Sequence, residues 1–157
     1  MWHGKGKDGY TYAHTGFAVA CNRYFFENVG KLADFNIVGA ADHMQAWARV
    51  GNVESTMPGD ISPGYKTLCE QWQSKAERAC GGLFGYTPGR IEHHWHGKKE
   101  NRQYWNRWQI LIKNNFNPMT DLAYDSQGLV VLCGKNKNAI EHDLMQYNRQ
   151  RTEDGNF

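Results

Sequence analysis

The stretch "SPGYKTLCEQWQSKAERACGG", residues 62–82, is the most regular part of the sequence and indicates which kind of fold the chain adopts. Ser62 is a favoured helix cap, Pro63 suits the first helical turn, and Gly81 with Gly82 favours a helix end. Apolar and small side chains recur at three- and four-residue spacing: Tyr65, Leu68, Cys69, Trp72, Ala76 and Ala79. The stretch therefore predicts an amphipathic helix with one buried face.

Other segments predict further helices and a few short strands around this helix. Helices are expected at 23–30, 42–50, 99–115 and 138–151, the first two closed by Gly30 and Gly51. A buried strand is expected at 15–22 and a second strand at 128–134, with a loop at 1–12 and a frayed tail at 151–157. The sequence thus predicts a single α+β domain over residues 1–157, helix-rich with a few short strands.

Composition narrows the class of protein. The 157 residues include 18 basic and 16 acidic side chains, so the net charge of +2 gives no bulk attraction for nucleic acid. Aromatic residues make up 13%, which favours a well-packed core or a site that stacks on sugars or bases. No run of about 18 apolar residues predicts a membrane span.

The four cysteines are far apart and form no C-x-x-C pair. They are expected to be reduced and mostly buried thiols of a cytoplasmic protein.

Three histidines gather in the stretch "HHWHGKK", residues 93–99. On an extended strand His93 and Trp95 share one face, whereas His94 and His96 share the other. Neutral imidazoles suit Mn, Zn or Fe, with an Asp or Glu ligand from elsewhere in the chain. The alternative is that one histidine packs and the others are solvated.

Asp42 and His43 follow the small residues Gly39, Ala40 and Ala41, which allow a ligand to approach the backbone closely. A carboxylate in this place can serve as a general base for a hydroxyl nucleophile, or it can simply stabilise the start of a helix. Basic residues around 98–107 can clamp a phosphate or diphosphate, or they can form a solvated helix face.

Three segments together resemble a known family: "HTGFAVACNRYFFENVGKL", "DFNIVGAADHMQAWARVG" and "GYTPGRIEHHWHGKKENRQYWNRWQILI". Their order and spacing are similar to the C-terminal half of a GT-A-type glycosyltransferase, of the family 2-like kind found in bacteria and their phages. The likeness extends from about residue 14 to the end of the chain.

This resemblance implies a transferase that uses a nucleotide-sugar donor and a glycan or another hydroxyl acceptor. Asp42 would be the catalytic carboxylate, and His96, helped by His93, would ligate a divalent metal, Mn or Mg. The expected contacts to the donor diphosphate are Lys98, Lys99 and Arg102. The expected contacts to the acceptor or sugar are His14, Thr15, Gly16, His43 and Trp95.

Two features depart from the family pattern. Many relatives carry two acids at the turn, whereas here Asp42 is followed by His43. The sequence also has no D-x-D motif, because its aspartates at 8, 34, 42, 60, 121, 125, 143 and 154 never lie two apart. The nucleotide-binding half, roughly 100 or more residues, is therefore expected outside this sequence. The chain would then be a fragment that starts at an internal methionine, one half of a split enzyme whose other half is a separate chain, or a degenerate remnant.

Two other functions are compatible with the same residues. A non-catalytic carbohydrate-binding or structural protein would use exposed aromatic rings without the D-x-D motif. A metal-dependent ββα nuclease would use His96 and Asn101, but the balanced charge argues against it.

Overall fold

The computed structural model of the chain describes residues 18–30, 32–85, 87, 88, 90, 92, 103, 104 and 106–151, together with strands at 3–5 and 11–13. Six α-helices, one 3-10 helix and four short strands are found in this described part of the chain.

The longest helix, α3 (Pro63–Cys80), forms as the sequence predicts. The Ser62 side chain accepts a hydrogen bond from the Tyr65 backbone N–H at 3.3 Å, and Gly81 ends the helix with a φ of 54°. The buried residues of α3 follow the expected stripe: Tyr65, Cys69, Trp72 and Ala76. Leu68 and Ala79 of the same stripe are half-buried and pack against the core.

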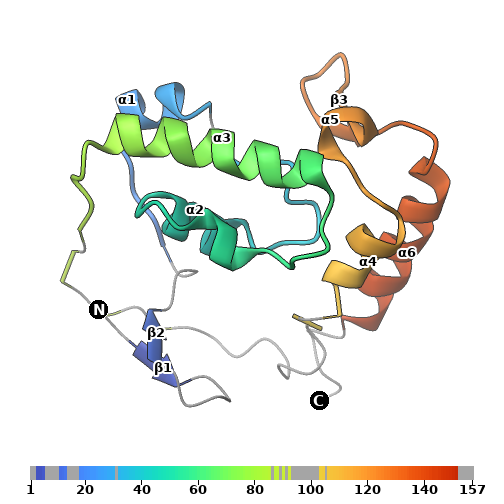
Figure 1. Ribbon diagram of the computed structural model, residues 1–157, viewed down its shortest axis with the longest axis horizontal. Coiled ribbons are helices and arrows are strands. Elements are labelled where there is room, and N and C mark those ends of the chain that lie inside the picture. Colours follow the sequence, from blue (N-terminus) through green and yellow to red (C-terminus); the bar gives the residue numbers. More distant parts are fainter. Residues whose placement is uncertain are drawn as a thin grey trace.

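Three shorter elements cover this stripe on the N-terminal side: α1 (Arg23–Asn28), α2 (Ala41–Ala48) and the 3-10 helix η1 (Val53–Thr56). In Figure 1, α2 runs below α3, and α1 lies at the same end as the C-terminus of α3. Phe25, Met44 and Ala48 join the core from these helices. The expected positions of α1 and α2 are confirmed, with Gly30 and Gly51 at positive φ just beyond them.

The C-terminal part consists of α4 (Trp108–Lys113), α5 (Pro118–Asp121), β3 (Leu122–Tyr124), β4 (Val130–Leu132) and α6 (Lys137–Gln150). Figure 1 shows α4 and α6 side by side beyond the N-terminal end of α3. Ser62 joins the two parts, because its hydroxyl donates a 2.5 Å hydrogen bond to the Phe116 carbonyl. Trp108, Leu111, Ile140 and Tyr147 continue the same hydrophobic core.

Two antiparallel hairpins contain all the described strands. β3 pairs with β4, with Leu122 opposite Leu132, which confirms the strand expected at 128–134. The Tyr124 hydroxyl donates to the Asp34 carboxylate at 2.8 Å and ties this hairpin to the loop before α2. β1 (His3–Lys5) pairs with β2 (Thr11–Ala13), so the expectation of a loop throughout residues 1–12 was wrong.

The strand expected at 15–22 and the long helix expected at 99–115 also differ from the structure. Residues 18–22 are exposed and form no strand; Asn22 instead caps α1, accepting from the Phe25 N–H at 2.7 Å. Gln103 has a φ of 46°, which a right-handed helix does not accommodate, and α4 begins only at Trp108. The α+β, helix-rich class is confirmed.

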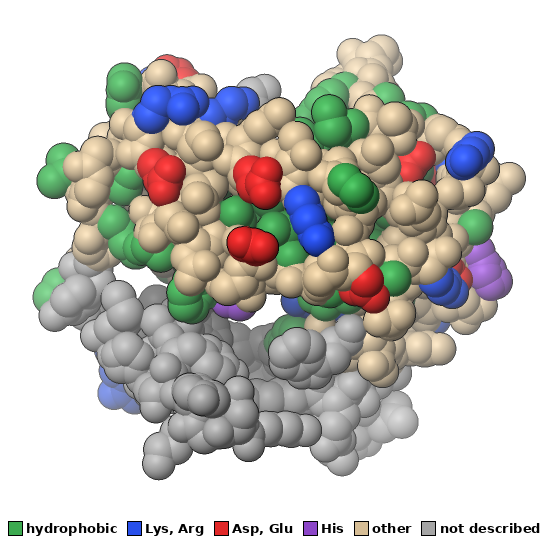
Figure 2. Space-filling model, in the orientation of Figure 1, with side chains coloured by type: hydrophobic (Ala, Val, Ile, Leu, Met, Phe, Trp, Pro, Cys, Tyr) green, Lys and Arg blue, Asp and Glu red, His purple; other side chains and the backbone are tan. Residues whose placement is uncertain are grey.

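The surface carries charges of both signs. Figure 2 shows Lys and Arg side chains along the upper edge of the face that it draws and Asp and Glu side chains across the middle of that face.

The cysteines are free, as expected, but the expectation that most are buried was wrong. Cys69 is buried, Cys80 and Cys133 are half-buried, and Cys21 is exposed.

Candidate functional site

The first turn of α2 carries Asp42 and His43, the two predicted site residues that the structure describes. Gly39 and Ala40 precede the helix with φ values of 93° and 69°, so the chain enters α2 through two left-handed residues. Ala40 provides no side-chain cap to α2. Asp42 is exposed, and His43 is half-buried with its ring edge-on to Trp47 at a centroid distance of 6.0 Å.

Arg107 reaches this turn from the segment that leads into α4. Its Nη1 would lie 2.8 Å from a Cβ built on Gly39, so the guanidinium occupies the space that a side chain at position 39 would need. The guanidinium also stacks over the Tyr104 ring, with Cζ 5.1 Å from the ring centroid. Arg107 Nε is buried and has no hydrogen-bond partner. A cation is therefore held beside the start of α2.

The environment keeps the His43 imidazole neutral at pH 7. Burial lowers its pKa below the ordinary 6.5, and the positive charge of Arg107 lowers it further. The negative charge of Asp42 acts in the opposite direction without reversing the shift. A neutral imidazole can donate one hydrogen bond and accept another, which suits a polar ligand.

The other nine predicted site residues lie in parts of the chain that the structure does not describe. They are His14, Thr15, Gly16, His93, Trp95, His96, Lys98, Lys99 and Arg102. The structure brings Asp42 and His43 together with Arg107, which the sequence suggested only as one of several basic residues. A glycine beside a long cationic side chain, here Gly39 with Arg107, is the pattern that could have suggested this contact. The two residues are 68 positions apart, so the sequence alone does not bring them together.

The described residues do not form a metal site. Within this part of the chain, no three side chains of His, Cys, Asp or Glu are grouped so that they could hold an ion. The expected ligands His93 and His96 lie outside it, so the assignment of Mn or Mg stays a prediction.

Comparisons with protein-family models, with curated proteins and with solved structures found no match for this chain. Among the described helices, none is long and apolar enough to cross a membrane.

Proposed function

We propose that this chain is the acceptor-side part of a nucleotide-sugar glycosyltransferase with a GT-A-like fold, and that Asp42 acts on the acceptor hydroxyl. One observation carries the proposal: the first turn of α2 carries an exposed carboxylate next to a half-buried neutral imidazole, and the cation of Arg107 lies against Gly39 at the entry to the same helix. The resemblance of the sequence to family 2-like enzymes suggests the reaction, which is sugar transfer with Asp42 as the catalytic carboxylate.

In the proposed reaction Asp42 is the general base. Its carboxylate accepts the proton of the acceptor hydroxyl while the hydroxyl oxygen bonds to the anomeric carbon of the donor sugar. The bond from that carbon to the diphosphate breaks, and the nucleoside diphosphate leaves with the electron pair. Arg107 is suited to a negatively charged partner, because guanidinium groups bind phosphates through several N–H donors.

Aromatic rings beside His43 and Arg107 support a sugar as the ligand. Trp47 lies one turn after His43 on α2 and is half-buried. The Tyr104 ring, below the Arg107 guanidinium, keeps 42% of its surface exposed. Rings of this kind offer an apolar face to a sugar, while Asp42 and His43 offer hydrogen-bond partners to its hydroxyl groups.

The donor side of the proposal rests on residues outside the described part of the chain. Lys98, Lys99 and Arg102 would contact the diphosphate, and His96 with His93 would ligate Mn or Mg. Such a metal would supply charge neutralisation at the leaving group. The nucleotide-binding half would lie outside the given sequence, and where a separate chain supplies it, that chain is the expected partner.

Sugar binding can be tested on this chain alone. We expect titration with glucose, galactose, mannose or N-acetylglucosamine to shift the NMR signals of the α2 backbone amides and of the Trp47 indole. Asp42→Asn should weaken this binding, whereas Asp60→Asn, an exposed acid on another segment, should leave it unchanged.

Catalysis can be tested after the chain is combined with the nucleotide-binding half of a family 2-like enzyme. Release of nucleoside diphosphate from a panel of nucleotide-sugars should then depend on Asp42. Asp42→Asn should lower kcat by roughly 10²- to 10⁴-fold with little change in the donor KM. Sugar binding without turnover would favour the non-catalytic carbohydrate-binding alternative. An unchanged kcat in Asp42→Asn would remove Asp42 from the mechanism.

A further inference from the structure

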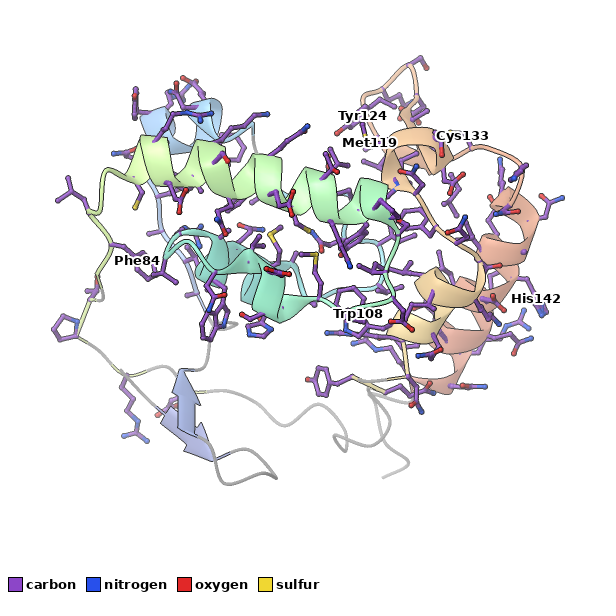
Figure 3. The ribbon with its side chains drawn as sticks, viewed as in Figure 1. Phe84, Trp108, Met119, Tyr124, Cys133 and His142 are labelled. Carbon is purple, nitrogen blue, oxygen red and sulfur yellow. The ribbon has the colours of Figure 1, made fainter. Side chains whose placement is uncertain are left out.

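The backbone of Arg107 is fixed on both sides. Its N–H donates to the Gln103 carbonyl at 3.0 Å, and its own carbonyl accepts from the Ile110 N–H at 3.2 Å. The next residue is Trp108 (labelled in Figure 3), which is buried and packs edge-on to Tyr65 of α3 at a centroid distance of 5.9 Å. The side chain of Arg107 therefore starts from a point that the hydrophobic core holds in place.

The guanidinium of Arg107 has no acidic partner among the described residues. The ion pairs found in this part of the chain join other side chains. Nε of Arg107 is the one nitrogen of the group that is both enclosed and without a hydrogen-bond acceptor, so Nη1 and Nη2 keep contact with the surface. A partly desolvated charge without an acceptor costs free energy, and an anion that pairs with the two Nη groups would recover part of it.

Two neighbours determine how an anion can reach this guanidinium. The Tyr104 ring covers one face, with its centroid 5.1 Å from Cζ of Arg107. Nη1 lies against Gly39, where an added Cβ would be only 2.8 Å away, so a side chain at position 39 would cover this nitrogen. The edge formed by Nη1 and Nη2 is the part of a guanidinium that pairs with two oxygens of one anion.

The charges at this turn favour an anion with a single negative charge. Arg107 brings one positive charge, and His43 adds none at pH 7, because burial lowers its pKa. Asp42 is exposed in the first turn of α2, three positions after Gly39, and repels a ligand more strongly the more negative that ligand is. A carboxylate, planar and singly charged, matches these conditions better than a phosphate does.

We propose that the acceptor for this site is an acidic sugar, a uronic acid whose carboxylate pairs with Nη1 and Nη2 of Arg107. This inference rests on the proposed function, which supplies the sugar and the role of Asp42, and it adds the charge of the acceptor. The carboxylate of a uronic acid lies across the ring from two of its hydroxyl groups, so one of these hydroxyls can meet Asp42 without bringing the two carboxylates together. The His43 ring, edge-on to Trp47 at 6.0 Å, offers a further hydrogen-bond partner to a hydroxyl.

The test compares matched sugars by NMR titration of the whole chain. Glucuronate and galacturonate are each compared with the neutral parent sugar, and glucuronamide serves as an uncharged ligand of nearly the same shape. We expect the α2 amides and the Trp47 indole to report roughly 10-fold or tighter binding of the acidic sugar, because hydrogen bonds to a charged group are worth more than neutral ones. Arg107→Gln should remove this preference, and Arg107→Lys should retain part of it.

Arg49→Gln is the matched control. The Arg49 guanidinium also stacks on an aromatic ring, with Cζ 5.2 Å from the centroid of Phe25, but it stands at the opposite end of α2 from Asp42. This variant should keep the preference for the acidic sugar. A preference that survives in Arg107→Gln, or is lost equally in Arg49→Gln, would overturn the assignment to Arg107.

The outcomes separate this inference from the function on which it rests. Equal binding of acidic and neutral sugars by the wild type would overturn the inference and leave the proposed function standing. Binding of neither kind of sugar would overturn both. Acetate that binds as tightly as glucuronate would show that the anion, without the sugar, is what the site recognises, and would overturn the acidic acceptor. Pyrophosphate that shifts the same amides through Arg107, with no preference for the acidic sugar, would place this guanidinium on the donor side instead.

Discussion

At the scale of single residues, His43 reports the electrostatics of the α2 turn. Its neighbours act in opposite directions, since Arg107 lowers the pKa of the imidazole and Asp42 raises it, while burial is the largest influence. We expect NMR titration of the ring protons to give a pKa below 6.5. Arg107→Gln should raise that pKa and Asp42→Asn should lower it, whereas Asp60→Asn should leave it unchanged.

The same shift sets a dependence of stability on pH. The folded state holds the neutral imidazole, so the unfolded state binds the proton more readily. The stability that His43 contributes is thus present above pH 6.5 and lost as the pH falls from there through the folded-state pKa. If Arg107→Gln instead lowered the pKa of His43, the Arg107 guanidinium would not be the positive charge that lowers this pKa.

At the scale of elements, Gly64 in the first turn of α3 fixes how closely α3 approaches α5. A Cβ at this position would lie 2.0 Å from Oδ1 of Asn117, the atom that caps α5 by accepting from the Met119 N–H at 3.1 Å. Gly64→Ala must therefore displace that cap, at a cost of about 1–3 kcal/mol, which the better helix propensity of alanine offsets in part. Urea denaturation measures this loss.

Gly59→Ala is the matched control, because an added Cβ there meets no atom within 4 Å and the glycine has no positive φ. We expect Gly59→Ala to be close to neutral. Equal stability of the two variants would show that α5 moves away from α3 without cost.

Elements were predictable wherever local rules decide them. Ser62, Pro63 and Gly81 specify both ends of α3, and the spacing of its apolar residues specifies its buried face. The left-handed φ of Gln103 has no sequence signal, since nothing in its side chain requires it, and it shortens the helix expected at 99–115. The candidate site was half predictable: Asp42 was found by its place after small residues, but Arg107 reaches it through a contact that only the fold creates.

At the scale of the whole molecule, Ser62 connects the N-terminal helices to the C-terminal part. Its hydroxyl accepts from the Tyr65 N–H and donates to the carbonyl of Phe116, which lies 54 positions away. Trp108, labelled in Figure 3, is the first residue of α4 in the C-terminal part. Ser62→Ala removes a helix cap and also leaves a buried carbonyl without its donor, so we expect a loss of roughly 2–4 kcal/mol.

Asn22→Ala provides the comparison, because the Asn22 side chain caps α1 and, within the described residues, bonds to no second part of the chain. Its loss should be about 1 kcal/mol. Guanidinium denaturation followed by tryptophan fluorescence and by circular dichroism measures both variants. A loss in Ser62→Ala no larger than that in Asn22→Ala would mean that the bond to Phe116 adds nothing to the cap.

The contact between Gly39 and Arg107 has a consequence for how this sequence can change over time. Because the guanidinium fills the space above Gly39, a larger residue at position 39 would displace the end of the Arg107 side chain from the α2 turn, and the φ of 93° would strain that residue as well. The two positions are thus expected to vary together among homologous chains, although 68 positions separate them. Homologous chains that keep Arg107 are expected to keep Gly39 as well. This pair would therefore mark the homologues that share the turn that carries Asp42.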